Sequence, residues 1–149
     1  MLSRKSEELI KRANDLAFNR KHEFCTTEHI FFALLEDPWI KQILDACGAN
    51  IQKFIDELGP YLEKEIPKIV EIPGLVDRRA APEFTLAVQS LIQRALFQVQ
   101  ASGGDEIEPE DLLVAMFQAK SSFALKLLKA QSVDRLDVIS FLSHGERDS

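Results

Sequence analysis

The 149-residue chain lacks the features that mark disulfide-stabilised, membrane and secreted proteins. Its only two cysteines, Cys25 and Cys47, have a spacing that matches neither a redox pair nor a zinc motif. We expect both to be free thiols that pack as small hydrophobic residues. No apolar run approaches the roughly 20 residues that cross a bilayer, and no secretory signal is visible before the first charged segment. These absences predict a cytoplasmic protein that makes no use of a membrane.

The chain also lacks a surplus of basic charge. Its 24 acidic side chains outnumber its 18 lysines and arginines, which gives a net charge of −6. A protein that binds the phosphate backbone of a nucleic acid needs lysine and arginine concentrated on one face. We therefore expect no nucleic acid partner, and basic or polar proteins are more compatible with this charge.

Signatures of catalysis are missing too. The adjacent glycines Gly103 and Gly104 precede Asp105 without the lysine of a phosphate-binding loop. No nucleophile motif and no pair of catalytic carboxylates stands out. The sequence thus indicates a binding domain, without enzymatic activity and without a cofactor of its own.

A metal site is a further possibility that the spacing disfavours. His22 and His29 have Cys25 and two glutamates nearby, so the types of ligand would suffice. However, two histidines separated by six residues across a loop and a helix start match no established metal motif, and a closed tetrahedral set is missing. We expect no bound metal.

What the sequence does contain is an internal duplication. The segment Leu9–Ala13 recurs as Leu91–Ala95, and the same 82-residue offset relates Thr26–Leu35 to Glu108–Phe117. Because one offset holds for both pairs, each copy should be a complete unit, paired with its twin by pseudo-two-fold symmetry. A duplicated helical unit of this kind presents a groove or paired surfaces between its copies.

The apolar spacing within each copy predicts helices. Residues at i, i+3 or i+4, and i+7 place a long first helix at about 4–20 and again at about 84–102. Second helices are predicted at about 28–36 and 110–118, with Thr26 and Glu108 at the cap positions. Glu28 and Glu110 then lie in the first turns, where the helix dipole stabilises a carboxylate by about 0.3–1 kcal/mol without any partner.

A third and a fourth helix complete each copy. The third follows Pro38 in the first copy and begins near Phe123 in the second, and the fourth spans Ile51 to about Leu62 and Val133 to Leu142. The predicted fold class is all-α, with eight helices. We expect the apolar stripes to form the core and four other aromatic residues to be partly exposed. The stripes include Phe31, Phe32, Phe117 and Phe141; the other four are Phe24, Trp39, Phe84 and Phe123.

These helices define one domain over residues 1–143. The first repeat is predicted at 3–62, the second at 84–143, and a connector lies at 63–83. Pro67, Pro73 and Pro82 prevent a long helix there, whereas the apolar residues between them indicate that part of the connector packs back in extended form. Residues 144–149 look like the start of a linker to modules that are absent here.

Several motifs in this order resemble a known family. They are His22-Glu23-Phe24, Thr26-x-Glu28-His29, Arg94-Ala95, Val99-Gln100-x-Ser102-Gly103, Arg135-Leu136-Asp137-Val138 and Ser143-His144-Gly145. The chain resembles the Clp N-terminal repeat domain of bacterial AAA+ unfoldases, and within that group it is most similar to the ClpA type. The resemblance covers nearly the whole chain.

The resemblance implies a role that composition alone does not. Full-length relatives are hexameric ATPases that use ATP and Mg²⁺ and feed unfolded chains to the ClpP peptidase, while the isolated domain is expected to be a monomer. In ClpA-like proteins this domain docks the ClpS adaptor and contributes to the recognition of substrate proteins. By motif position, the adaptor contacts fall on two surface carboxylates, Glu23 and Glu28, and on Thr85.

Two alternatives remain open at this point. ClpC-type relatives bind phosphoarginine-marked proteins at two acidic sites that correspond to Glu28 and Glu110, although Glu108 and Asp111 add negative charge that disfavours a phosphate at the second site. The other alternative is a stand-alone helical scaffold for protein interactions.

Overall fold

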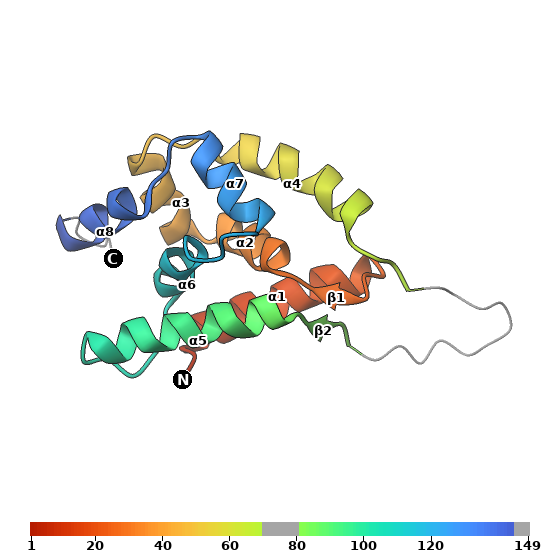
Figure 1. Cartoon of the computed structure of the whole chain (residues 1–149), viewed down its shortest axis with the longest axis horizontal. Coiled ribbons are helices and arrows are strands. Elements are labelled where there is room, and N and C mark those ends of the chain that lie inside the picture. The colour runs from red at the N-terminus through yellow and green to blue at the C-terminus, as the bar shows by residue number, and fades with distance from the viewer. Residues whose placement is uncertain (70–80, 145–149) are drawn as a thin grey trace, which may run out of the picture.

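The computed structural model describes residues 1–69 and 81–144, and over these residues it is an all-α fold (Figure 1). The elements are α1 (Arg4–Asn19), β1 (Phe24–Cys25), α2 (Thr27–Glu36), α3 (Pro38–Ala46), α4 (Ile51–Glu65), β2 (Glu83–Phe84), α5 (Leu86–Ala101), α6 (Pro109–Met116), α7 (Phe123–Ala130) and α8 (Arg135–His144). The eight predicted helices are confirmed. None of the described helices combines the length and the apolar character that a membrane span requires.

Helix boundaries differ from the predictions where local chemistry overrides periodicity. Helix α5 begins at Leu86 because Phe84 pairs in β2 and the Thr85 side chain caps the helix by accepting from the Val88 N–H at 3.2 Å. Helix α4 continues past Leu62 to Glu65 and includes Pro60. Pro60 lies on the exposed side of α4, where water can satisfy the carbonyl that loses its helical donor.

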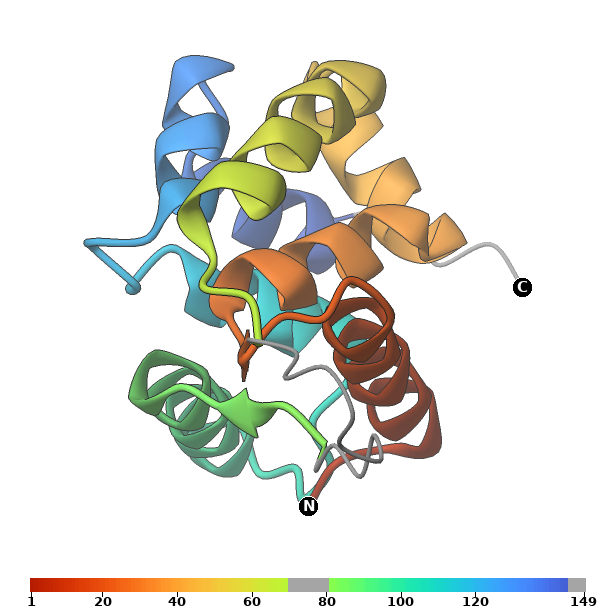
Figure 2. The ribbon, with the colours of Figure 1, turned by 90° about the vertical axis from the view of Figure 1, so that its right-hand side faces the viewer.

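Helix α2 is the centre of the molecule. It contacts α1, α3, α4, α5, α6 and α7, and most of its side chains are buried. Helices α1 and α5 lie at one end, on opposite sides of it, α2 and α6 form the middle, and the other four helices cover the opposite end (Figure 2). Phe31 of α2 packs edge-on against Phe54 of α4, with ring centroids 5.5 Å apart.

Short extended segments of the two halves of the chain pair with each other. Leu2, just before α1, pairs in parallel with Ile107, just before α6, and Phe84 pairs in parallel with Cys25 just before α2. The two pairs are equivalent, because Phe84 lies 82 residues after Leu2 and Ile107 lies 82 residues after Cys25. Helix α5 likewise begins and ends 82 residues after α1. These correspondences agree with the predicted duplication.

The first three residues of the predicted connector, 63–65, continue α4, whereas residues 66–69 are extended and pack back on the domain. Ile66 is buried, the Ile69 N–H donates to the Lys21 carbonyl at 2.8 Å, and the Glu23 N–H donates to the Pro67 carbonyl at 2.9 Å. The rest of the connector at 70–80, with Pro73, and the predicted linker at 145–149 lie outside the described residues.

Both cysteines are free thiols. Cys25 is fully buried beside α1, and this burial raises the pKa of its thiol to about 12. Cys47 is partly buried at the end of α3. The thiols are therefore held protonated and pack as small apolar groups.

Candidate functional site

A hollow of about 630 Å³ lies between α2, α4, α5 and the connection from α6 to α7. Hydroxyl groups dominate its lining, and we call it the hydroxyl-rich hollow. It is lined by Thr26, Thr27, Glu28, Tyr61, Thr85, Ala87, Ser90, Arg94, Gln118, Ala119, Lys120, Ser121, Ser122 and Phe123. Both repeats contribute to it, so it forms only in the complete domain.

Two of the three predicted adaptor contacts line this hollow. Glu28 comes from the first turn of α2 and Thr85 from the cap of α5, so residues from different repeats meet there. Glu23 does not line the hollow but lies on the neighbouring strand edge, where its carbonyl accepts from the Glu83 N–H at 3.2 Å. Glu23 is exposed to solvent.

Glu28 is buried, unlike the surface carboxylate that the resemblance implied. Only 5 % of it is exposed, and its Oε2 atom accepts from the Thr27 hydroxyl at 3.0 Å and from the Ala124 N–H at 3.1 Å. Ala124 is the second residue of α7. The carboxylate therefore joins the N-termini of α2 and α7, where both helix dipoles stabilise a negative charge.

Cations and an aromatic wall complete the hollow. Arg94 lines it and donates to the Gln118 carbonyl at 2.6 Å, and Lys120 lines it from the loop before α7. Tyr61 stacks on Phe123, with ring centroids 4.2 Å apart and planes 4° from parallel. Burial, with Glu28 and Glu65 nearby, raises the pKa of Tyr61, so its hydroxyl stays protonated.

The second copy repeats this arrangement with different chemistry. The Glu110 Oε2 atom, in the first turn of α6, accepts from the Trp39 indole N–H at 3.1 Å. Trp39 is the second residue of α3, as Ala124 is of α7, so each glutamate reaches the third helix of the other repeat. Trp39 lines a smaller hollow of about 290 Å³ together with Arg12, which lies 82 residues before Arg94.

The neighbours of Glu110 are engaged with the backbone. Asp111 accepts from the Glu108 N–H at 2.8 Å, and burial raises the pKa of the Asp111 carboxyl. The Asp111 carboxyl group therefore caps the start of α6 and is not available to a ligand through the oxygen that accepts this bond.

His22 and His29 form a buried, hydrogen-bonded pair. The Thr26 N–H donates to His29 Nδ1 at 2.9 Å, which makes that nitrogen an acceptor and places the proton on Nε2. This Nε2–H then donates to His22 Nδ1 at 2.9 Å. Among the described residues, no group of three histidine, cysteine or carboxylate side chains could hold a metal ion.

Sequence reasoning missed the most exposed apolar side chains of the helices. Leu86 and Phe97 on α5 and Leu136 on α8 are 79 %, 61 % and 69 % exposed, whereas Trp39, expected to be partly exposed, is buried. The duplication held a usable signal, because Arg4 and Asp15 of α1 are the charged counterparts of Leu86 and Phe97 at the 82-residue offset. An apolar residue at a position where the twin helix carries a charge indicates exposure.

Comparison with known proteins identifies the family. Residues 1–131 match the Clp repeat (R) N-terminal domain, and the chain belongs to this family. A ClpA homolog protein of Fuscovulum blasticum is 32 % identical over 139 residues, which cover 93 % of this chain and 17 % of that protein. The chain thus spans about a sixth of the length of this relative.

Solved structures share the fold at low sequence identity. The N-terminal domain of Hsp104 from Candida albicans superposes with a TM-score of 0.76 at 13 % identity, covering 98 % of this chain and 93 % of that chain. A ClpV N-domain, solved in complex with a VipB peptide, has a TM-score of 0.70 at 18 % identity, covering 96 % and 85 %. These structures therefore share the fold of this chain.

Proposed function

We propose that this chain is the adaptor- and substrate-recognition domain of a cytoplasmic ClpA-like unfoldase that delivers proteins to the ClpP peptidase. The observation that carries the proposal is the convergence of Glu28 and Thr85 at one hollow, with exposed Glu23 on the adjacent strand edge. The identity to a ClpA homolog supports this subtype. The ATPase activity, with its ATP and Mg²⁺, and the hexameric state would belong to the rest of the protein.

The three residues have different roles in this proposal. Glu23 offers an exposed carboxylate, and Thr85 offers a hydroxyl that still has a hydrogen to donate while it caps α5. These two contact the ClpS-type adaptor directly. Glu28 is a positioning residue, because its Oε2 atom already accepts two hydrogen bonds and holds α7 against α2.

The duplication supplies a matched control for the test. Asp105 is exposed and lies 82 residues after Glu23, so it presents a carboxylate at the equivalent place in the other repeat. Titration calorimetry with a ClpS-type adaptor should show that Glu23→Ala weakens binding at least tenfold, about 1.4 kcal/mol. Asp105→Ala should change affinity less than twofold. Equal effects of the two variants would place the adaptor site elsewhere.

The alternative function is direct binding of phosphoarginine-marked proteins, as in ClpC. It is favoured by the presence of Glu28, Arg94 and Lys120 in one hollow, since a carboxylate suits a guanidinium and two cations suit a phosphate. Calorimetry with a phosphoarginine peptide and the same peptide with plain arginine separates the two functions. Binding that requires the phosphate and is lost in Arg94→Gln would support this alternative. A pull-down that recovers neither adaptor nor marked proteins would favour a stand-alone scaffold.

A further inference from the structure

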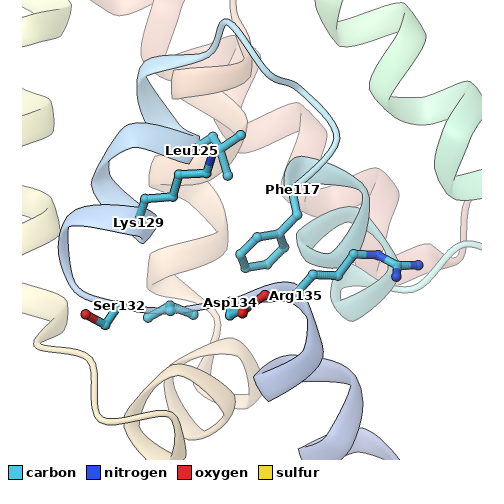
Figure 3. A pocket seen from close by; sticks show the side chains of 7 residues that line it. Phe117, Leu125, Lys129, Ser132, Asp134 and Arg135 are labelled. Atoms are coloured by element: carbon cyan, nitrogen blue, oxygen red, sulfur yellow. The ribbon is translucent and has the colours of Figure 1, made fainter.

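A second hollow lies where the end of α6 meets α7 and the start of α8, and the adaptor proposal makes no use of it. Its volume is about 450 Å³, and it shares no lining residue with the hydroxyl-rich hollow. Figure 3 shows Phe117 at its centre, with Leu125 and Lys129 on α7 to one side and Asp134 and Arg135 at the start of α8 below. We call it the α7–α8 hollow.

Apolar side chains line its inner surface. Leu125 and Val133 are almost fully buried, and Phe117, just beyond the last residue of α6, is partly exposed. An open hollow with an aromatic ring and two aliphatic side chains accepts one apolar side chain of a partner. The surface is too small to bury a whole helix face and suits a short segment.

Its charged lining is mainly positive. Lys129 and Arg135 both line the hollow, and neither forms an ion pair with a carboxylate of the described residues, while the Arg135 Nε atom is buried without a hydrogen-bond partner. Asp134 is the one acidic residue of the lining, and its carboxylate faces the Leu136 N–H at 3.4 Å in the first turn of α8. A negatively charged partner would therefore meet two cations and a single carboxylate, so positive charge prevails in this lining.

The first repeat shows that the turn itself does not require these cations. Ser132 and Gly48 both have positive φ, of 59° and 84°, and end α7 and α3 in the same way. Counting from these two residues, the positions of Lys129 and Arg135 correspond to Asp45 and Ile51. The same turn is thus built in the first repeat with a carboxylate and an apolar residue, so the two cations are a specific property of the second repeat.

We propose that the α7–α8 hollow binds a short acidic segment of a protein partner. One aliphatic or aromatic side chain of that segment enters between Phe117, Leu125 and Val133, and flanking carboxylates pair with Lys129 and Arg135. Opposite charge at the rim selects the partner, and burial of the apolar side chain supplies affinity. This site is additional to the adaptor surface and does not depend on it.

The test uses a fluorescent peptide with one central leucine flanked by glutamates. Two comparison peptides carry lysines in place of the glutamates, or alanine in place of the leucine. Anisotropy and NMR titration of the 149-residue chain should show binding only of the glutamate–leucine peptide, weakening as salt rises. Amide shifts should centre on Leu125, Ser132 and Val133.

Charge reversal locates the site. The double variant Lys129→Glu with Arg135→Glu should weaken binding at least tenfold, whereas Lys126→Glu with Lys53→Glu should change it less than twofold. The control pair changes net charge by the same amount at exposed positions outside the hollow. Thermal melts verify that both variants fold. Equal weakening by both pairs, equal binding of the lysine peptide, absence of binding, or shifts around Glu28 and Thr85 would each overturn the proposal.

Adaptor binding provides the second readout. The Lys129 and Arg135 variant should bind a ClpS-type adaptor with unchanged affinity, so failure of this proposal and failure of the adaptor proposal give different results.

Discussion

At the scale of single residues, the buried His22–His29 pair makes folding stability depend on pH. Burial lowers the pKa of His29 to about 4, with His22 and Arg20 contributing, and burial also lowers the pKa of His22. Above pH 6.5 both histidines are neutral in the folded and unfolded chain. Below that, the unfolded chain takes up protons that the folded chain refuses, so stability falls as pH decreases.

We therefore expect the free energy of unfolding to decline between pH 6.5 and about 4, by at most about 1.4 kcal/mol per pH unit for His29. His29→Gln should flatten this decline, because glutamine can still accept from the Thr26 N–H but does not titrate. Urea melts of both proteins across this range measure the slope. Identical slopes would show that carboxylates elsewhere cause the decline.

Glu28 gives a second prediction at this scale. Glu28→Ala should lower the free energy of unfolding by about 2 kcal/mol, because the buried Ala124 N–H loses its acceptor. Glu7 is a suitable control, since it is an exposed carboxylate in the first turn of α1. Glu7→Ala should cost less than about 1 kcal/mol, the size of a dipole effect alone. Chemical denaturation of the two variants decides this, and similar small losses would mean that the Ala124 contact contributes little.

At the scale of elements, glycine substitutions test how α4 and the turn after α3 are built. Gly59 lies inside α4 with open space around its Cβ position, so Gly59→Ala should stabilise the protein by about 0.5–1 kcal/mol. Gly48 has equal space but a φ of +84°, so Gly48→Ala should destabilise it by about 1 kcal/mol. Thermal melts should show a higher melting temperature for Gly59→Ala and a lower one for Gly48→Ala. A loss of stability in Gly59→Ala would mean that the Gly59–Pro60 region requires glycine for its backbone.

Periodicity predicted these elements because each helix buries a repeating stripe, and a stripe is a local property of the sequence. It predicted α4 through Pro60 to about Leu62 but missed the last residues to Glu65, because these are exposed and do not extend the apolar stripe. It could not predict β1 or β2, because each has two residues and exists only through its partner in the other half. Of the residues that line the hydroxyl-rich hollow, only Glu28 and Thr85 were predicted as site residues, from the family resemblance. The burial of Glu28 depends on Ala124, 96 positions away.

At the scale of the whole molecule, the two repeats depend on each other. Backbone pairing joins Cys25 to Phe84 and Leu2 to Ile107. In addition, the Asn50 N–H donates to the Gln131 side chain at 2.6 Å. We predict that a fragment of residues 1–69 is largely unfolded, whereas the 149-residue chain is a folded monomer. Circular dichroism and analytical ultracentrifugation measure both properties. A stably helical, monomeric fragment would show that one repeat suffices.

The pairing of segments between the halves also has a consequence for biosynthesis. The first half cannot complete its contacts as it leaves the ribosome, because Leu2 must wait for Ile107 and Glu28 must wait for Ala124. At roughly 5–20 residues per second, about 5–20 s pass between translation of Glu28 and translation of Ala124. For that interval α2 can pack against α1, α3 and α4 of its own half, whereas the surface that α5, α6 and α7 cover in the finished domain stays exposed on the nascent chain.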